Sequence, residues 1–248
     1  MCEYKLLHAG DTALVVEFGQ GINRRLNAKV LALAHRIAQS AAAGHLDGIV
    51  ETVPTFRSLM IHYDPLVLNH TALAARIEDM VRDLQPTMQA GRLWRLPVCY
   101  DPRVAPDLEE VARRTGLTPA AVAERHSAQT YHVYMLGFLP GQAYMGDLPA
   151  QLELPRRATP RLSIPAGSLA IAMNMTCIFP LQTPCGWHLI GRSPVPLWDS
   201  DAGRALLAPG DQVGFAPVSL RDFDELCAKA ADRTLRIEPI AAEVGAAA

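Results

Sequence analysis

Proline and glycine are distributed unevenly along this 248-residue chain, and the distribution divides it into two parts. Only Pro54, Pro65 and Pro86 of the 19 prolines precede residue 91, and only five of the 17 glycines do. A sheet of many short strands needs glycine at bulges and turns and proline at strand edges. We therefore predict an α/β domain over residues 1–90 and a β-rich domain over residues 91–220. A C-terminal helix and a flexible tail are expected over residues 221–248.

The first 90 residues alternate extended runs with two amphipathic helices. Extended runs at 4–9 and 12–18 flank a turn at Gly10-Asp11, and a helix capped by Asn23 is predicted over 23–43. Runs at 48–53 and 58–63, a helix that ends before Pro86 and a run at 93–100 follow. The order strand, helix, strand, strand, helix, strand is typical of ferredoxin-like folds, with the first run as a hairpin extension. The fold class is therefore expected to be α+β.

Two short helices, at 107–115 and 118–125, begin the proline-rich part of the chain. Their spacing also fits a DNA-binding helix-turn-helix, but acidic side chains outnumber arginines in the pair. An αα-hairpin that joins two domains is the better interpretation. From residue 131 to about 215, runs of three to seven apolar or alternating residues lie between glycines and prolines. This pattern predicts a β-barrel or a β-sandwich.

Charge and motif content exclude several classes of protein. The 23 basic and 25 acidic residues leave a net charge of −2, which argues against nucleic acid or anionic membrane as the partner. We find neither a secretory signal nor an apolar run of the roughly 18 residues that span a membrane. The five cysteines form no Cys-x-x-Cys pair, so a zinc site and a disulfide framework are not expected. These features predict a cytoplasmic protein that binds a small molecule and holds no metal.

The polar residues able to do chemistry are concentrated between residues 126 and 192. His126 is a candidate acid or base, although packing or helix capping is an alternative for a lone histidine. Arg156, Arg157 and Arg161 lie among prolines and predict a rigid cationic loop for a carboxylate or phosphate. Arg156 and Arg161 are taken as catalytic candidates, as is Arg192, for which a salt bridge is equally expected. The substrate-binding candidates are Tyr134, Phe138, Gly141, Tyr144, Thr159, Gly167, Ser168, Thr183, Gly186 and Trp187.

Four motifs in this segment resemble a known family, that of the B subunit of the prokaryotic 5-oxoprolinase, also known as allophanate hydrolase subunit 1. The motifs are Arg125-His126-Ser127, Val133-Tyr134-Met135-Leu136-Gly137-Phe138-x-Pro140-Gly141, Pro155-Arg156-Arg157-Ala158-Thr159-Pro160-Arg161 and Thr183-Pro184-x-Gly186-Trp187-x-x-Ile190-Gly191-Arg192. The family includes an inhibitor of a sporulation histidine kinase and half of the carboxyltransferase domain of urea carboxylase. The chain departs from the family pattern at Gln142, Met173-Asn174, Cys177 and Cys185.

The resemblance implies a fold, an activity and partners. It implies an N-terminal α/β domain followed by a cyclophilin-like β-barrel. It also implies a protein that works with a homologous-fold C subunit and a separate A subunit to open the lactam of 5-oxoproline to glutamate with ATP hydrolysis. ATP is the implied cofactor, bound by this chain or by the complex. A regulatory protein that inhibits a histidine kinase and a component of urea or allophanate metabolism are the alternatives.

Overall fold

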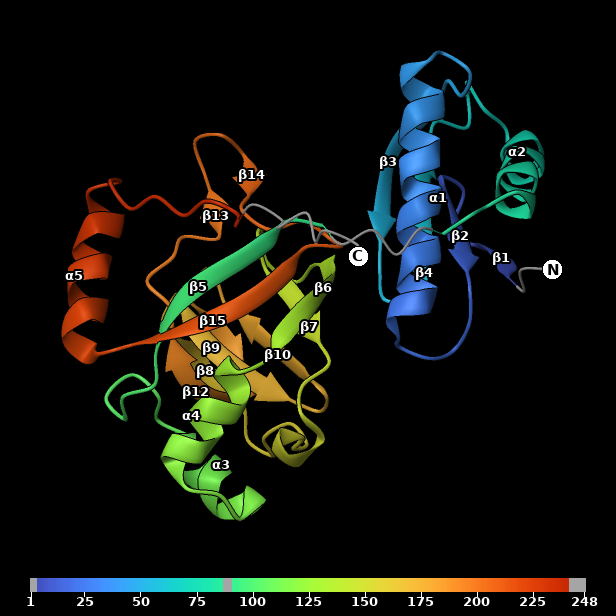
Figure 1. Ribbon diagram of the computed structural model, residues 1–248. Helices are drawn as coiled ribbons and strands as arrows, with labels where there is room; N and C mark the ends of the chain where they lie inside the picture. The colour runs from blue at the N-terminus through green and yellow to red at the C-terminus, as the bar shows by residue number, and fades with distance from the viewer. Residues whose placement is uncertain (1–3, 87–90, 241–248) are drawn as a thin grey trace, which may run out of the picture. The chain divides into compact units, whose positions relative to one another are not determined.

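The computed structural model describes residues 4–86 and 91–240, and the chain divides into two compact units, residues 1–89 and 90–248 (Figure 1). The first unit packs two helices against a four-stranded antiparallel sheet of order β1-β2-β4-β3. Its elements are β1 (Lys5–His8), β2 (Ala13–Glu17), α1 (Arg24–Ala42), β3 (Ile49–Pro54), β4 (Ser58–Tyr63) and α2 (His70–Arg82).

Cap residues and apolar stripes in the sequence account for both helices of the first unit. The Asn23 side chain accepts a hydrogen bond from the Leu26 N–H at the start of α1, and Asn69 accepts one from Ala72 at the start of α2. Residues at three- and four-residue steps bury one face of each helix against the sheet. In α1 and α2 these are Val30, Leu33, Ile37, Leu73, Ile77 and Val81.

The prediction that the run at 93–100 completes the sheet of the first unit is wrong. That run is β5 (Leu93–Cys99), and it pairs in parallel with β15 (Gln212–Val218) along its whole length. The free edge of β2 is instead occupied by β1, because the tight turn at Gly10 returns the chain directly as a hairpin. A two-strand hairpin closes over a few residues, whereas a return from α2 would need a longer loop. The first unit is thus an α/β unit without the last ferredoxin-like strand.

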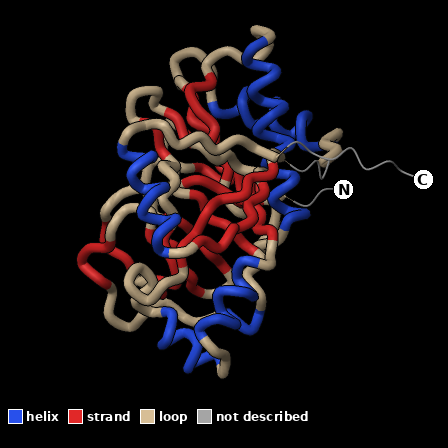
Figure 2. Tube along the Cα trace, turned by 60° about the vertical axis from the view of Figure 1, so that its left-hand side comes forward, coloured by secondary structure: helices blue, strands red, loops and turns tan. Residues whose placement is uncertain are grey.

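A closed barrel of seven strands forms the centre of the second unit, in the order β10-β7-β6-β15-β5-β12-β9. Its helices lie outside the strands (Figure 2). The predicted barrel is confirmed, and it is consistent with a cyclophilin-like barrel. Besides β5 and β15, the barrel strands are β6 (Thr130–Leu136), β7 (Ala143–Gly146), β9 (Ser168–Ala172), β10 (Met175–Ile178) and β12 (His188–Arg192).

Smaller elements surround the barrel. The predicted αα-hairpin consists of α3 and α4, but it does not join two domains: both helices belong to the second unit, where they contact β12 and β15 respectively. A two-stranded ribbon of β8 and β11 and a second ribbon of β13 and β14 lie outside the closed sheet. The predicted C-terminal helix is α5, while residues 241–248 of the predicted flexible tail lie outside the described residues. The bounds are α3 (Leu108–Thr115), α4 (Pro119–Ser127), η1 (Ala150–Leu152), β8 (Arg161–Ile164), β11 (Thr183–Cys185), β13 (Trp198–Asp199), β14 (Arg204–Ala205) and α5 (Leu220–Ala231).

No helix in the described part of the chain is both long enough and apolar enough to cross a membrane.

We expect Gly167→Ala to destabilise the barrel unit more than Gly116→Ala does. Both glycines have a left-handed backbone, with φ of +81° and +70° respectively. An added Cβ at Gly167 would collide with the Ser193 carbonyl oxygen, whereas at Gly116 it would meet open space. Thermal and urea unfolding should show a loss of about 1 kcal/mol for Gly116→Ala from backbone strain alone. The loss for Gly167→Ala should be at least about twice as large. Equal losses would contradict the close packing of the Gly167 turn against Ser193.

Candidate functional site

A buried carboxylate organises the predicted cationic loop. Asp107, at the start of α3, is only 3% exposed. Its Oδ1 accepts hydrogen bonds from Arg161 Nη2 at 2.6 Å and Arg157 Nη1 at 2.9 Å, and its Oδ2 accepts one from Arg161 Nη1 at 2.7 Å. The Leu189 N–H of β12 also donates to Oδ2, at 2.7 Å. The carboxylate therefore joins the helix pair, the loop and the barrel wall.

The two arginines keep this carboxylate ionised although it is buried. Burial by itself raises the pKa of Asp107, because a low-dielectric interior disfavours the charged form. The Arg161 guanidinium and the Leu189 N–H outweigh this effect, so the pKa of Asp107 lies below its ordinary value. The same pairing raises the pKa of Arg161. Arg161, predicted as catalytic, thus forms a two-pronged ion pair with a structural partner.

Arg156 is the arginine of the loop that stays available to a ligand. Its side chain is exposed, and it has no carboxylate partner among the described residues. A Cβ added at Gly186 would lie 3.8 Å from Arg156 Nε, so the guanidinium packs over the backbone of the 185–187 turn. The Arg157 N–H donates to the Gly186 carbonyl at 2.8 Å and fixes the loop against this turn. The predicted site residues Gly186 and Arg156 are therefore neighbours.

Aromatic side chains lie next to Arg156. Trp187 forms edge contacts with Tyr144 and Phe179, with ring centroids 6.1 and 6.4 Å apart. Burial raises the pKa of Tyr144, and the Arg156 charge acts in the opposite direction. Tyr144 is half-buried, so one side of its ring stays in contact with solvent. The structure thus brings four of the predicted site residues together: Arg156, Tyr144, Gly186 and Trp187.

The thiols of Cys177 and Cys185 are buried next to this group. Burial raises the pKa of Cys177 well above its ordinary value, and the nearby Cys185 raises it further. Burial also raises the pKa of Cys185, although the Trp187 N–H and the arginines oppose this. Both side chains are therefore thiols at neutral pH and poor nucleophiles. All four cysteines of the described residues are unpaired, as the sequence led us to expect.

His126, predicted as an acid or base, is fully buried on α4 instead. The Thr176 hydroxyl donates to the Ala170 carbonyl, so it accepts from His126 Nε2–H at 2.9 Å. His126 Nδ1 then accepts from the Tyr100 hydroxyl at 2.8 Å. The imidazole also stacks on Phe215 with ring centroids 4.9 Å apart. Burial lowers the pKa of His126 to about 3, so the ring is neutral and has both nitrogens occupied. This environment argues against proton transfer and favours the packing alternative.

Unlike Tyr144, the other predicted residues of the β6–β7 hairpin (Tyr134, Phe138 and Gly141) do not join the Arg156 group. Tyr134 is 1% exposed, and its hydroxyl donates to Asp147 Oδ1 at 3.1 Å. Gly141 has φ of +76°, and a Cβ there would lie 2.6 Å from the Leu197 carbonyl oxygen. Phe138 is 67% exposed and has a left-handed backbone, with φ of +70°. Tyr134 and Gly141 thus have packing roles, whereas Phe138 is an exposed apolar side chain.

Arg192 and its neighbours lie in a different part of the barrel unit, next to α5. Arg192 Nε donates to the Ala166 carbonyl at 2.9 Å, and its guanidinium lies over the Phe223 ring of α5 at 5.9 Å. The Gly167 N–H donates to the Phe179 carbonyl, and the Ser168 hydroxyl donates to the Pro165 carbonyl. These contacts join the 165–168 turn to α5. The salt bridge considered for Arg192 is absent among the described residues.

One predicted threonine lies in the arginine loop, and the other lies in the β8–β11 ribbon that follows the loop. Thr159 is exposed in the middle of the loop, between Arg157 and Arg161. Thr183 is buried and pairs with Ile164 in the β8–β11 ribbon.

Sequence reasoning missed three buried polar residues of the barrel unit, of which Asp107 and His188 contact this loop. Asp107 has the sequence signature of an ordinary helix-start carboxylate. His188 is 1% exposed, and its Nε2–H donates to the Pro155 carbonyl at 3.0 Å, which leaves Nδ1 without a partner among the described residues. Gln142, one of the departures from the family pattern, lies in the β6–β7 hairpin, is 1% exposed and has an Oε1 without a partner among the described residues. Only the position of His188 directly after Trp187 could have drawn attention to it.

The described residues contain no group of three or more His, Cys, Asp or Glu side chains placed to hold a metal ion.

Known proteins match the chain over nearly its whole length. Residues 4–208 match the family model described as carboxyltransferase domain, subdomain C and D. The 5-oxoprolinase B subunit of Bacillus subtilis is 36% identical over 232 residues, which cover 89% of this chain and 95% of that protein. The protein of the same name from Escherichia coli O157:H7 is 35% identical, and the match covers 84% of this chain and 93% of that protein. The urea amidolyase of Lachancea kluyveri is 26% identical, and the match covers 87% of this chain but 13% of that protein.

Solved structures share the fold. The structure of TTHA0988 in space group P212121 superposes with a TM-score of 0.74 at 34% identity, over 84% of this chain and 40% of that one. The Kluyveromyces lactis urea amidolyase gives a TM-score of 0.77 at 18% identity, over 96% of this chain and 16% of that one. The latter similarity concerns the fold alone.

Asp107→Asn should destabilise the barrel unit by about 3 kcal/mol, because it leaves two partly buried arginines without their carboxylate. Urea unfolding monitored by tryptophan fluorescence measures this loss. The matched control is Glu225→Gln, which breaks an ion pair to Arg221 within α5 of the same unit, with side chains 57% and 87% exposed. The control should show no measurable change. A loss at Asp107 no larger than that of the control would contradict its role as an anchor.

We expect the wild-type free energy of unfolding to fall as the pH is lowered from about 6.5 towards 3, in part because of His126. Unfolding exposes the imidazole, which then binds a proton at its ordinary pKa of 6.5, whereas the folded protein binds it only at about 3. One such group contributes about 1.4 kcal/mol per pH unit in this window. His126→Gln should flatten the profile, and the exposed His45→Gln should leave it unchanged. Identical profiles for wild type and His126→Gln would rule out the buried neutral imidazole.

Proposed function

The chain belongs to the carboxyltransferase domain, subdomain C and D, family, and on that premise we propose that it is one component of a 5-oxoprolinase-type lactam hydrolase. The observation that carries the proposal is the identity of 36% to a 5-oxoprolinase B subunit over 95% of that protein. The urea amidolyase match is weaker and covers only a small part of a longer protein. The regulatory alternative stays a sequence-based prediction.

The group around Arg156 suits a small cyclic carboxylate. The substrate 5-oxoproline is a five-membered lactam ring that carries one carboxylate. The Arg156 guanidinium can bind that carboxylate through two parallel hydrogen bonds, since no acidic side chain of the described residues competes for it. The half-buried Tyr144 ring, which packs against the buried Trp187, offers apolar surface for the methylene groups of the lactam. In this proposal Arg156 binds and orients the substrate.

The ATP that the family resemblance implies does not fit the same site. Triphosphates are held by several cations or by a glycine-rich loop with many free N–H groups. Here Arg157 and Arg161 are bound to Asp107, and the Gly186 carbonyl rather than its N–H faces the loop. We therefore assign the activation of the lactam carbonyl to the assembled complex and derive no step through ATP at Arg156.

The proposal requires partner proteins. Relatives of this chain are named as the B subunit of an enzyme, so at least one further component is implied for them. We propose that the partners here are a homologous-fold C subunit and a separate A subunit. Leu162 on β8 is 91% exposed directly after the arginine loop, and Leu181 before β11 is 40% exposed. These apolar side chains can be covered by a partner that also closes the Arg156 site.

Reconstitution tests the proposal directly. The chain is co-purified with its candidate A and C subunits, and ADP formation is measured with 5-oxoproline, allophanate or urea as substrate. We expect ADP formation that depends on 5-oxoproline and requires this chain. Activity that persists when this chain is omitted would refute the proposal. Activity with urea or allophanate alone would favour the alternative substrate class.

In the reconstituted complex, Arg156→Ala should lower kcat/KM for 5-oxoproline by at least about tenfold, through the loss of a charge-assisted contact of about 1.5–3 kcal/mol. Arg156→Lys should recover part of it, because an ammonium keeps the charge but not the two-pronged geometry. The thermal stability of the free chain should not change, since Arg156 is exposed. Arg113→Ala, an exposed arginine of α3, is the control. An unchanged kcat/KM for Arg156→Ala would exclude Arg156 from the substrate site.

A further inference from the structure

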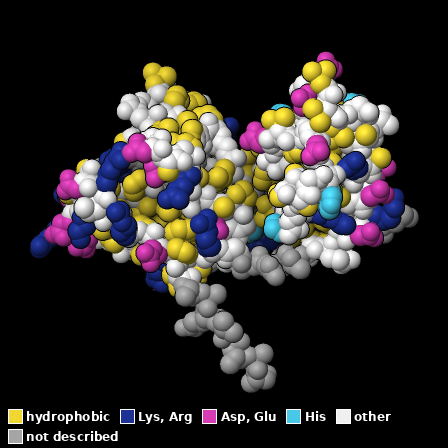
Figure 3. Space-filling model, turned by 90° about the horizontal axis from the view of Figure 1, so that it is seen from above, with side chains coloured by type: hydrophobic (Ala, Val, Ile, Leu, Met, Phe, Trp, Pro, Cys, Tyr) yellow, Lys and Arg dark blue, Asp and Glu magenta, His cyan; other side chains and the backbone are white. Residues whose placement is uncertain are grey.

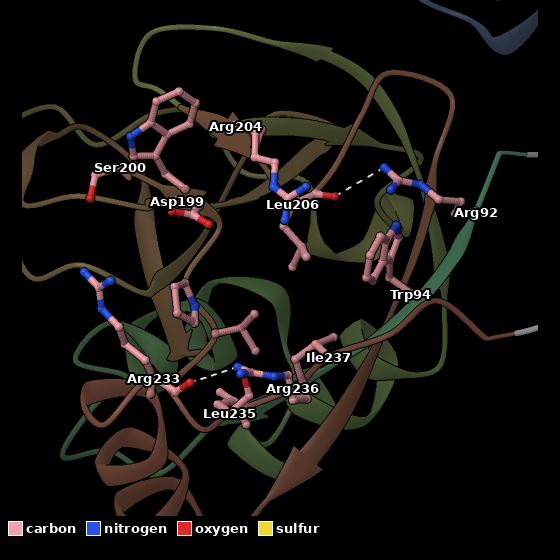
Figure 4. A pocket seen from close by; sticks show the side chains of 15 residues that line it. Arg92, Trp94, Asp199, Ser200, Arg204, Leu206, Arg233, Leu235, Arg236 and Ile237 are labelled. Carbon is pink, nitrogen blue, oxygen red and sulfur yellow. Dashed lines mark hydrogen bonds between the residues drawn. The ribbon is translucent and has the colours of Figure 1, made fainter. Parts of the chain in front are cut away.

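A cavity that is lined by no residue of the Arg156 group lies in the barrel unit (Figure 4). Its volume is about 600 Å³, within the range of small-molecule sites in proteins. Three segments that are distant in the sequence form its walls: the start of β5, the chain from Val195 through β14, and α5 with the residues that follow it. None of the motifs that indicated the Arg156 site falls in this cavity.

Four arginines and one carboxylate line the cavity. Figure 4 shows Arg92 and Arg204 on one side and Arg233 and Arg236 on the other. The single acidic residue, Asp199, uses its Oδ1 to accept the N–H groups of Asp201 and Ala202 in its own turn. The surface of this unit in Figure 3 shows Lys and Arg side chains gathered around exposed hydrophobic ones. The lining therefore has an excess of positive charge.

Two of these arginines are neutralised by carboxylates outside the lining, and two are not. Arg92 Nη2 donates to Asp211 Oδ2 at 2.7 Å, and Arg233 pairs with Asp201. Neither Arg204 nor Arg236 has a carboxylate partner in the part of the chain that the structure describes. Arg236 donates only to the main-chain carbonyls of residues 233 and 235, at 2.8 and 3.3 Å. Two guanidinium groups without a compensating carboxylate thus line one cavity from different sides.

Apart from Ser200, the rest of the lining is apolar and includes two indole rings. Trp94 is fixed by the Arg92 guanidinium, 4.9 Å from its ring centroid, and by a hydrogen bond from Nε1 to Asp211 Oδ2 at 2.9 Å. Trp198 on β13 is only half-buried. The remaining apolar lining residues are Val195, Pro196, Ala205, Leu206, Ala230, Leu235 and Ile237. Such walls suit a flat, apolar group.

The backbone at the end of α5 points to a use for the Arg233 side chain. Arg233 has φ of +57°, at the position after a helix where glycine is strongly preferred. The N–H groups of Arg233 and Thr234 donate to the Ala230 and Lys229 carbonyls, which closes the helix end in the usual way. A side chain at this position costs about 1 kcal/mol compared with glycine. This cost is retained at a residue whose guanidinium lines the cavity.

We propose that this cavity binds a small organic phosphate with a planar aromatic group, of the size and chemistry of a mononucleotide. Arg204 and Arg236 belong to different segments and reach an anion from different directions, which suits the several oxygens of a phosphate better than the single plane of a carboxylate. The aromatic group lies against the partly exposed Trp198 indole ring and the aliphatic walls. The inference does not rest on the proposed function, because this chain alone forms all the walls.

The test is calorimetric titration of the full chain without partner proteins, with ADP, adenosine and inorganic phosphate as separate probes. ADP should bind, and adenosine and phosphate should each bind at least tenfold more weakly, because each offers only one half of the recognised chemistry. Arg204→Ala and Arg236→Ala should each weaken ADP binding by at least tenfold. Arg125→Ala, an exposed arginine of α4 outside the cavity, should have no effect.

Arg233→Gly separates binding from folding, since glycine suits φ of +57° and keeps the helix end intact. It should weaken ADP binding several-fold while the melting temperature stays at or above that of the wild type. The proposal is overturned if ADP does not bind at millimolar concentration. It is equally overturned if adenosine binds as tightly as ADP, if phosphate alone does so, or if the arginine variants bind ADP like the Arg125→Ala control.

Discussion

The buried carboxylate of Asp107 is the interaction on which the arrangement of the barrel unit depends. It contacts residues at least 50 positions further along the chain, through two guanidinium groups and one main-chain N–H. A carboxylate that has left water must be paired, so the loop at 155–161 cannot move away from α3 without a large loss of free energy. The exposure of Arg156 is a consequence, because its two neighbours in the loop are held inward.

The closed barrel explains how the chain can carry two separate ligand-sized regions. Its strands satisfy one another's hydrogen bonds, so the turns at either end are free to differ in sequence and length. One set of turns brings Arg156, Gly186 and Trp187 together. Another set, with the chain that follows α5, surrounds the cavity of Arg204 and Arg236. The first region matches a small cyclic carboxylate, and the second has the charge and the apolar area for a larger anion.

Local patterns predicted the secondary structure well, because caps, apolar stripes and turn residues act within a few positions. The helix starts at Asn23 and Thr118 are examples, since each side chain bonds an N–H three residues on. The site residues were harder to predict. His126 and His188 are both buried histidines, and the sequence singled out the one whose two nitrogens are occupied. The partners of those nitrogens lie 26 and 50 positions away, and no local pattern carries that information.

Sequence patterns were sufficient for the boundary near residue 90, the β-rich character of the second part, the positions of the helices and the family to which the chain belongs. Glycine, proline and cap residues determine these features because they act on the backbone within a few positions. The family follows from motifs that can be identified directly in the sequence. The folded chain was needed to show that the run at 93–99 is a barrel strand and that β1 takes its expected place beside β2. It was also needed to show that Arg157 and Arg161 are bound to Asp107 while Arg156 stays exposed. Strand pairing and ion pairing join residues that are distant in the chain, and the choice among chemically equivalent partners is made only when the whole unit packs.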